Sequence, residues 1–326
     1  MRASVLRRVR PVVDAQLGVI TSTQLRVLGV DGEVPRREGW LRLAAGIWVV
    51  HSDPTDEQLL VALQRYAPAA VASGALACRW LQLRHAPDTA GCDALVEHGT
   101  NLLGGALLRM RQTRRLAEAV ERRGRRVAPA ARAVADAARW TPRLQDARAV
   151  VLAALHDRRV TPQALADDLD AGPRRTSRHL RRALEDWERG ARSAPEAEAA
   201  DSLLALPGRR PSPPFLLNPD LRLDGVLLGS PDGWVPAAGL GWEMDSVEFH
   251  GDSDALDATL VRHQAFTDAG FELLHVTPKR FRAAPSAWAA DVVARAEARV
   301  ARGWRPPPGL VVTPAGPVLS PGLVAA

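Results

Sequence analysis

The sequence predicts an α+β fold divided into at least two domains. Its 326 residues exceed what a single hydrophobic core ordinarily serves, and the hydrophobic periodicity changes from helical to strand-like beyond residue 206. Charge is divided as well: residues 1–190 hold 31 Lys+Arg and 21 Asp+Glu, whereas residues 191–326 hold 12 and 16. We therefore expect a basic front part suited to nucleic acid and an acidic back part suited to a cation.

The composition excludes several classes of protein. No run approaches the about 18 apolar residues of a membrane span, and no leader pattern opens the sequence, so we expect no membrane partner and a cytoplasmic location. Only Cys78 and Cys92 occur, and neither lies in a Cys-x-x-Cys or Cys/His pattern. This usage indicates a reducing compartment and no zinc site.

Residues 11–50 have the pattern of a small winged helix. Thr21-Ser-Thr-Gln24 is a capping-box pattern that opens a helix. The recognition helix is expected next, at Asp31–Gly39, where a glycine and a proline leave room for little more than one turn. Trp40–Leu43 and Ile47–Val50 then predict a β-hairpin, the wing. With the helices after it, this pattern predicts a winged-helix-like domain over residues 1–90.

The middle of the chain predicts a mixed, mainly helical region over residues 91–190. Residues 56–82 predict a helix broken near Pro68, with Ser73 capping the second piece. Short strand patterns near Ala94–Glu97 and Leu107–Met110 predict a small sheet. Helices are expected over Pro129–Trp140, Leu144–Leu155, a segment opened by Thr161-Pro162, and residues 173–190. The last of these carries five arginines, which favours a solvated helix face, with phosphate contact as the alternative.

A separate domain is expected over residues 191–302. Ser193-Ala-Pro-Glu196 caps a helix that runs to Leu206. Strands at Pro214–Asn218, Gly225–Trp234 and Leu240–Val247, a helix at Ala255–Ala269, a strand at Phe271–Thr277 and a helix at Ala287–Ala301 complete the order αβββαβα. Residues 303–326 are rich in Pro and Gly and predict a disordered tail with no core to join.

Carboxylates gather around one predicted strand of this domain. In a strand, side chains alternate faces, so Glu243 and Asp245 point one way while Trp242 and Met244 point the other. Asp232 belongs to the preceding strand of a predicted hairpin, which brings it beside Glu243. Oxygen ligands of this kind are what Mg²⁺ or Mn²⁺ requires. Such an ion orients a water and shields phosphodiester oxygens during attack.

Pro231-Asp232 followed by Glu243-Met-Asp245, in an αβββαβ order, resembles the PD-(D/E)XK restriction-endonuclease-like fold. More narrowly, "SAPEAE", "GSPDGWVP", "EMDSVEFH" and "RHQAFTDAGFELLHVTP" together resemble the branch related to very-short-patch-repair endonucleases. The resemblance implies metal ligands at Asp232, Glu243 and Glu196, catalytic roles for Asp232, Glu243, Asp245 and His250, and a phosphate contact for Arg262.

The sequence departs from that family at position 245. Where the parent pattern has lysine, this chain has aspartate, and a lysine there would position the water and stabilise charge on the phosphate. Lys279, at the end of the next predicted strand, is the alternative source of that charge.

The front half resembles a second family. "GVITSTQLRVLGV" with "GIWVV", and later "VAPAARAVADAARW" with "RVTPQALADDL", resemble the AbiEi-like type IV antitoxins over residues 11–190. The resemblance implies a DNA-binding winged helix and a cognate toxin as partner. The short recognition segment puts base reading in doubt, but Arg36, Arg37 and the wing's Arg42 are available for phosphate.

Two functions follow as alternatives. The leading hypothesis is a DNA-binding, Mg²⁺- or Mn²⁺-dependent endonuclease. The alternative is a non-catalytic repressor or antitoxin-type regulator in which a degenerate nuclease fold serves interaction, including assembly of a homodimer. For Glu243 and Asp245 the simpler alternative is an edge strand with a solvated acidic face. His263 and His275 are interpreted as structural.

Overall fold

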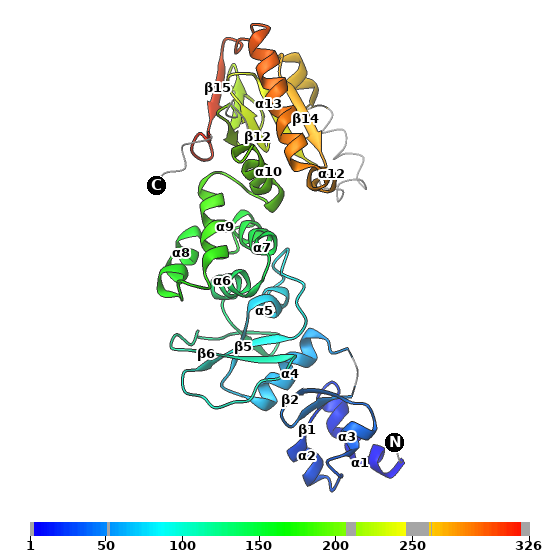
Figure 1. Ribbon diagram of the computed structural model, residues 1–326. Helices are drawn as coiled ribbons and strands as arrows, with labels where there is room; N and C mark the ends of the chain where they lie inside the picture. Colours follow the sequence, from blue (N-terminus) through cyan, green and yellow to red (C-terminus); the bar gives the residue numbers. More distant parts are fainter. Residues whose placement is uncertain (1–2, 51–52, 207–212, 246–260, 262, 321–326) are drawn as a thin grey trace. The chain divides into compact units, whose positions relative to one another are not determined.

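The computed structural model describes residues 3–50, 53–206, 213–245, 261 and 263–320. Within these ranges the chain is a mixed α+β protein whose strands form four sheets of three to five strands. This confirms the predicted class. The chain divides into two compact units, residues 1–181 and residues 182–326 (Figure 1). None of the described helices combines the length and the apolar character that crossing a membrane requires.

The first unit begins with a small helical and three-stranded segment. Its elements are α1 (Ala3–Ala15), β1 (Val19–Thr21), α2 (Ser22–Val27), α3 (Val34–Arg37), β2 (Leu41–Ala44) and β3 (Ile47–Val49). Thr21 begins α2 with the predicted capping box: its hydroxyl accepts from the Gln24 N–H, and the Gln24 side chain accepts from the Thr21 N–H. β2 and β3 pair antiparallel, as the predicted wing requires, and β1 adds to β3. Helix α1 was not predicted.

Helix α3 is short, as the sequence indicates. It spans four residues, with Pro35 in its first turn, and Gly39 follows in the left-handed region at φ +71°. Val34 faces a core that includes Leu25 and Trp48. A helix of this length offers few side chains to a DNA groove.

The rest of the first unit contains a five-stranded sheet and a group of helices. Its elements are α4 (Asp56–Tyr66), β4 (Val71–Ser73), α5 (Gly74–Trp80), β5 (Cys92–Glu97), β6 (Leu108–Thr113), β7 (Val120–Arg122), β8 (Arg125–Val127), α6 (Ala130–Trp140), α7 (Leu144–His156) and α8 (Pro162–Ala171). The sheet has the order β6-β5-β4-β8-β7. The predicted break near Pro68 therefore holds a central strand, β4. Ser73 makes no capping hydrogen bond in α5 and donates instead to Asp136 at 2.8 Å.

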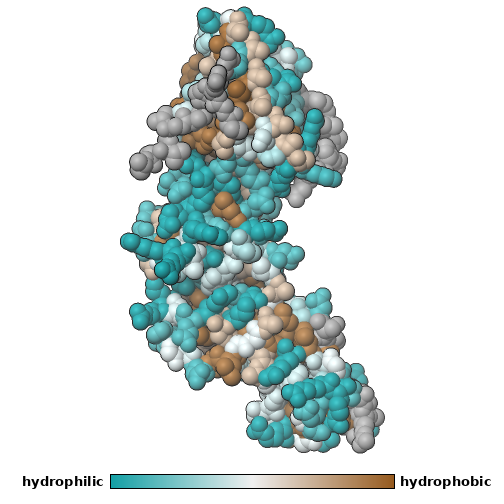
Figure 2. Space-filling model, in the orientation of Figure 1, coloured by the Kyte–Doolittle hydropathy of each residue, from teal (hydrophilic) through white to brown (hydrophobic). Residues whose placement is uncertain are grey.

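Helix α9 (Arg178–Glu188) and the turn before it carry the five arginines noted in the sequence. Four of them are exposed, and these are Arg174, Arg175, Arg178 and Arg181. Arg182 is half-buried and forms an ion pair with Asp186 at 3.1 Å. Hydrophilic residues cover much of the surface around α8 and α9 in Figure 2. This exposure agrees with a solvated helix face.

The second unit is built on a four-stranded sheet. Its elements are α10 (Ala194–Leu204), β9 (Leu216–Leu217), β12 (Gly233–Val235), β13 (Leu240–Met244), β14 (Glu272–Val276), α12 (Pro278–Ala283) and α13 (Pro285–Ala301). The sheet has the order β14-β13-β12-β9; β14 runs parallel to β13, and the other pairs are antiparallel. Residues 263–268 are helical and lie between the two parallel strands in sequence, as a parallel connection requires.

Helices cover this sheet on the side to which β13 turns its apolar residues. Trp242 packs edge-on against Trp288 of α13, with ring centroids 5.8 Å apart. Met244 packs with Phe281 of α12 and Ala199 of α10. Because strand residues alternate, Glu243 and Asp245 belong to the opposite face. The acids therefore lie on the face of the sheet opposite to the one from which Trp242 and Met244 pack against α10, α12 and α13.

The predicted disordered tail is wrong for residues 303–320. A second sheet has the order β11-β10-β15, formed by β10 (Asp220–Leu223), β11 (Val226–Gly229) and β15 (Leu310–Thr313). Leu310 and Val312 of β15 pack against the core that contains Leu221 and Trp234. The tail joins this core because Leu310 and Val312 alternate with outward-facing residues, a strand period that the nearby Pro and Gly residues obscured.

Candidate metal centre of the second unit

The end of β13 carries two of the acids singled out in the sequence. Glu243 is the fourth residue of the strand, and Asp245 follows its last residue. Glu243 is buried, with 7% of its surface exposed, whereas Asp245 is exposed. β13 therefore supplies one desolvated and one solvent-facing carboxylate to the same face of the sheet.

Asp232 reaches the same place from the neighbouring strand. Gly233 of β12 pairs with Trp242 of β13, so Asp232, one residue before β12, lies across from Glu243. Asp232 Oδ2 accepts a hydrogen bond from the Met244 N–H at 2.6 Å. Asp232, Glu243 and Asp245 thus form one group, which we call the acidic cluster.

The acidic cluster is electrostatically unfavourable without a cation. Burial, followed by the neighbouring carboxylates of Glu196, Glu243 and Asp245, raises the pKa of Asp232 well above its ordinary value. The hydrogen bond from the Met244 N–H acts in the opposite direction. A bound divalent cation would offset this repulsion.

Glu196 lies in the first turn of α10, and hydrogen bonds occupy its carboxylate. Ser193 Oγ donates to Oε1 at 2.6 Å, while the Arg192 N–H and Asn218 Nδ2 donate to Oε2 at 2.8 and 2.5 Å. Burial raises the pKa of Glu196, and these hydrogen bonds oppose the shift. The residue therefore ties the start of α10 to Asn218, while its charge acts on Asp232.

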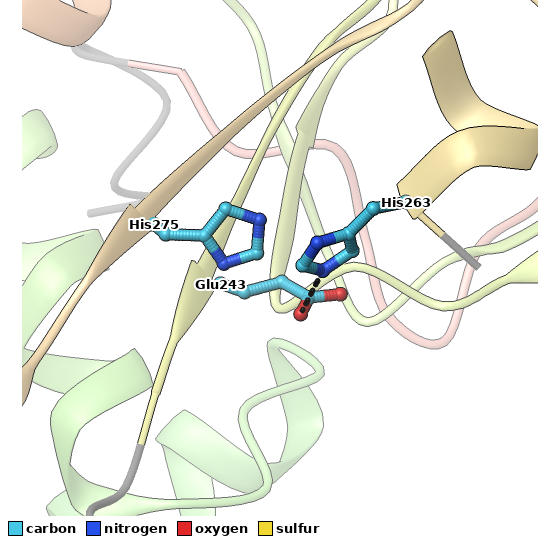
Figure 3. Close-up of side chains that lie close together, drawn as sticks. All are labelled: Glu243, His263 and His275. Atoms are coloured by element: carbon cyan, nitrogen blue, oxygen red, sulfur yellow. Dashed lines mark ion pairs between the residues drawn. The ribbon is translucent and has the colours of Figure 1, made fainter. Parts of the chain in front are cut away.

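Two histidines, which we expected from the sequence to be structural, also lie beside Glu243. His275 pairs with Glu243 in the parallel register of β14 and β13, and His263 comes from the helical residues 263–268. One ligand atom from each of Glu243, His263 and His275 lies within 4.8 Å of the other two. His263 Nε2 lies 3.7 Å from Glu243 Oε2. Figure 3 shows the two rings side by side next to the Glu243 carboxylate.

These three residues form what we call the Glu-His-His group. Among the described residues it is the one set of three such side chains whose ligand atoms meet this closely, and neither Asp232 nor Glu196 belongs to it. Both histidines lie within the segment "RHQAFTDAGFELLHVTP", so the sequence already contained a pair of candidate metal ligands. Their convergence depends on the parallel register of β13 and β14, which the sequence alone does not specify.

Asp245 connects the acidic cluster to the Glu-His-His group. Asp245 Oδ2 lies 3.0 Å from His275 Nδ1. The backbone N–H of Asp245 donates to the Val276 carbonyl at 3.0 Å, which holds the two strand ends together. A carboxylate on one ring nitrogen fixes the orientation of a histidine and leaves the other nitrogen for a ligand.

The remaining predicted site residues do not join this site among the residues that the structure describes. His250 and Arg262 fall outside the described residues. In the first unit, Arg36 pairs with Glu33 at 3.1 Å, and Arg37 pairs with Asp31 at 2.6 Å. Arg42 donates to the Ala44 carbonyl, and its guanidinium lies over the Trp48 ring, 5.8 Å from the centroid. Lys279 is exposed in the first turn of α12, on a different element from Asp245.

Comparison of the chain with models of known protein families finds no match, and comparison with curated proteins finds no relative. The chemistry of the acidic cluster and of the Glu-His-His group therefore rests on their own geometry.

Proposed function

We propose that the protein is a DNA-binding, divalent-metal-dependent phosphodiesterase whose hydrolytic site is the acidic cluster. The observation that carries this proposal is the hydrogen bond from the Met244 N–H to Asp232, which holds a carboxylate of one strand against the acidic end of the next. Two strands thereby supply Asp232 and Glu243 to one place, where a structural role alone would favour separating like charges.

The residues present suit a divalent cation. Asp232 is only partly exposed and Glu243 is buried, so their negative charge is poorly screened by water. Asp232 and Glu243 would hold the ion. Bound there, a divalent cation lowers the pKa of a water and neutralises charge on the phosphodiester oxygens. The residues of the chain supply the rest: Asp245 fixes the orientation of His275, and Glu196 anchors the start of α10 behind Asp232.

The arrangement of the second unit supports the same proposal. α10, β9, β12, β13, the helical residues 263–268 and β14 follow one another with β14 parallel to β13. This is compatible with the αβββαβ order of PD-(D/E)XK nucleases, in which β10 and β11 would be an insertion. His250 retains its predicted catalytic role, and Arg262 its predicted phosphate contact, as parts of this proposal.

The first unit would recruit DNA. Residues 1–181 hold 29 Lys+Arg and 18 Asp+Glu, eleven more basic than acidic side chains, and such an excess attracts the phosphate backbone without regard to sequence. Arg36 and Arg37 are exposed, and their ion pairs are surface pairs of small net stability. They can therefore exchange Glu33 and Asp31 for phosphate at little cost.

A second candidate function is the non-catalytic regulator, and the chemistry of position 245 favours it. Asp245 stands where the related nucleases have lysine, and it is hydrogen-bonded to His275. A carboxylate there gives no positive charge to the developing phosphate. On this alternative the protein binds an operator, alone or with a toxin, and hydrolyses nothing.

The two functions are separated by measuring binding and cleavage on the same DNA. Single-stranded, duplex and mismatched oligonucleotides are incubated with the full chain and with Mg²⁺ or Mn²⁺, and each sample is divided between a binding assay and a product assay. Products that disappear with EDTA support the phosphodiesterase. Tight binding of one duplex sequence with intact DNA under every ion supports the regulator.

A further inference from the structure

The Glu-His-His group shares Glu243 with the acidic cluster, but its other donor atoms differ. It supplies two imidazole nitrogens and one carboxylate oxygen, whereas the acidic cluster supplies carboxylate oxygens alone. Mg²⁺ prefers oxygen ligands in octahedral arrangement and keeps much of its water. Imidazole nitrogen suits zinc and the later transition metals. The two histidines therefore change which ion the site selects.

The spacing of the three residues is close to what a zinc ion needs. With bonds of about 2.0–2.1 Å, tetrahedral ligand atoms lie about 3.3 Å apart. His263 Nε2 and Glu243 Oε2 are 3.7 Å apart, and all three ligand atoms lie within 4.8 Å of one another. The two imidazole rings have centroids 4.1 Å apart and are tilted by 44°, so they come together without stacking flat. Small rotations of the side chains would close the set.

Asp245 holds one of these histidines in the orientation that a metal ligand requires. Its carboxylate lies 3.0 Å from His275 Nδ1, which leaves Nε2 as the nitrogen free to bind. Metal-ligating histidines ordinarily donate their second N–H to such a carboxylate. In this role Asp245 is a positioning residue, which gives a reason for an aspartate where the related nucleases have lysine.

We propose that Glu243, His263 and His275 bind a zinc-class transition metal ion, with Asp245 orienting His275 and with an open position left for water or substrate. Two histidines and one glutamate are a ligand set of catalytic zinc sites. The low cysteine content of the chain does not bear on this set, because no cysteine belongs to it. The inference rests on the proposed function for the use of the ion in hydrolysis, but its test measures metal binding.

The test compares ions on the full chain. Protein stripped with EDTA and dialysed is titrated with Zn²⁺ in competition with a chromophoric chelator, and with Mg²⁺ by calorimetry. We expect one Zn²⁺ per chain, bound at least about a hundredfold more tightly than Mg²⁺. This comparison needs no variant, so it holds even if a substitution disturbs folding. Equal or tighter binding of Mg²⁺ would overturn the proposal.

Variants then locate the ion. His263→Ala and His275→Ala should each weaken Zn²⁺ binding by at least about tenfold, and Asp245→Ala by about 10 to 100-fold. His98→Ala is the control, because His98 is an exposed histidine in the first unit. Zn²⁺ affinity that is unchanged in both histidine variants of the second unit would also overturn the proposal.

The zinc-site proposal and the phosphodiesterase proposal can be refuted independently of each other. Zn²⁺ binding that depends on both histidines, with no DNA cleavage under any ion, would leave the metal site standing and remove the phosphodiesterase. Zn²⁺ affinity that is unchanged in the His263→Ala, His275→Ala double variant, together with Mg²⁺-supported cleavage, would remove the metal site and leave the phosphodiesterase.

Discussion

Asp232 accepts a hydrogen bond from the backbone N–H of Met244, with 2.6 Å between Asp232 Oδ2 and Met244 N. This contact ties the residue before β12 to the last residue of β13. It also holds the Asp232 carboxylate close to Glu243 and Asp245; burial, followed by the charges of Glu196, Glu243 and Asp245, raises the pKa of Asp232. Burial and like charge in the acidic cluster therefore make the metal-free second unit sensitive to pH, while the hydrogen bond from Met244 opposes the shift.

The pH dependence has a definite sign. Burial and neighbouring carboxylates raise the pKa of Asp232 above its ordinary 3.8 in the folded chain, so the folded state binds the proton more tightly than the unfolded state. Stability from this group is present at low pH and is lost as pH rises from 3.8 through the raised pKa. Asp232→Asn removes the charge and keeps an acceptor for the Met244 N–H. In EDTA, urea unfolding should show the variant more stable than the wild type at pH 7 and not at pH 3.5. A constant difference at both pH values would contradict this account of Asp232.

Glu196 should matter more to folding than to metal binding. Its carboxylate accepts hydrogen bonds from Ser193, Arg192 and Asn218, so Glu196→Ala removes an acceptor from three partly buried donors. We expect a loss of about 1–3 kcal/mol in the free energy of unfolding. Metal affinity of the folded variant should fall by less than about tenfold, because an indirect charge effect is small beside the loss of a ligand. Glu198→Ala on the same helix, which removes an ion pair with Arg282, is the control for metal affinity alone. A complete loss of metal binding in well-folded Glu196→Ala would instead make Glu196 a ligand.

Strand β15 should be part of the folded second unit. Val312 packs against the core that contains Leu221 and Trp234, whereas its neighbour Val311 is 54% exposed. Val312→Asp should therefore lower the free energy of unfolding by about 1–3 kcal/mol, the cost of placing a polar group against that core. Val311→Asp on the same strand should change it by less than about 0.5 kcal/mol. Equal effects in a thermal or urea denaturation experiment would mean that β15 does not contribute to the core.

Arg36 and Arg37 should bind phosphate only by giving up their present partners. Replacing both with alanine should weaken DNA binding and lower the slope of log affinity against log salt by about 2. The reciprocal pair Asp31→Asn and Glu33→Gln should strengthen binding, because it frees both arginines. Fluorescence anisotropy of labelled DNA over a salt series measures the affinity and the salt slope of each double variant. Unchanged slopes in both double variants would exclude this surface as the DNA contact.

Local sequence signals predicted many elements of the fold. The capping box at Thr21 and Gln24 and the cap at Ser193 each place a helix start within a few residues, because one side chain satisfies one backbone donor. The strand of Glu243 was predicted from alternation. Strand β4 was missed because its three residues lie between two helical patterns, and its pairing with β5 and β8 is long-range. Strands β10 and β15 were missed for the same reason, because they pair with each other across a long stretch of sequence.

The candidate site was predictable only in part. Asp232 and Glu243 come together through a hairpin-type pairing of neighbouring strands, which spacing in the sequence suggests. His263 and His275 come together with Glu243 through a parallel pairing across a connection of nearly thirty residues, about which local periodicity carries no information. The sequence also did not predict that three hydrogen bonds would engage the Glu196 carboxylate, because one donor, Asn218, comes from a distant part of the chain.

Metal-dependent cleavage of DNA by matched acid variants decides whether the acidic cluster is a hydrolytic site. The full chain, stripped of metal, is incubated with single-stranded and duplex DNA and with Mg²⁺, Mn²⁺ or Zn²⁺, beside Asp232→Ala, Glu243→Ala and the control Asp291→Ala, which removes an exposed acid of α13. We expect cleavage by the wild type and by Asp291→Ala, and a loss of at least about a hundredfold in both cluster variants. Intact DNA with the wild type under all three ions, or equal cleavage by both cluster variants, would contradict the proposed phosphodiesterase.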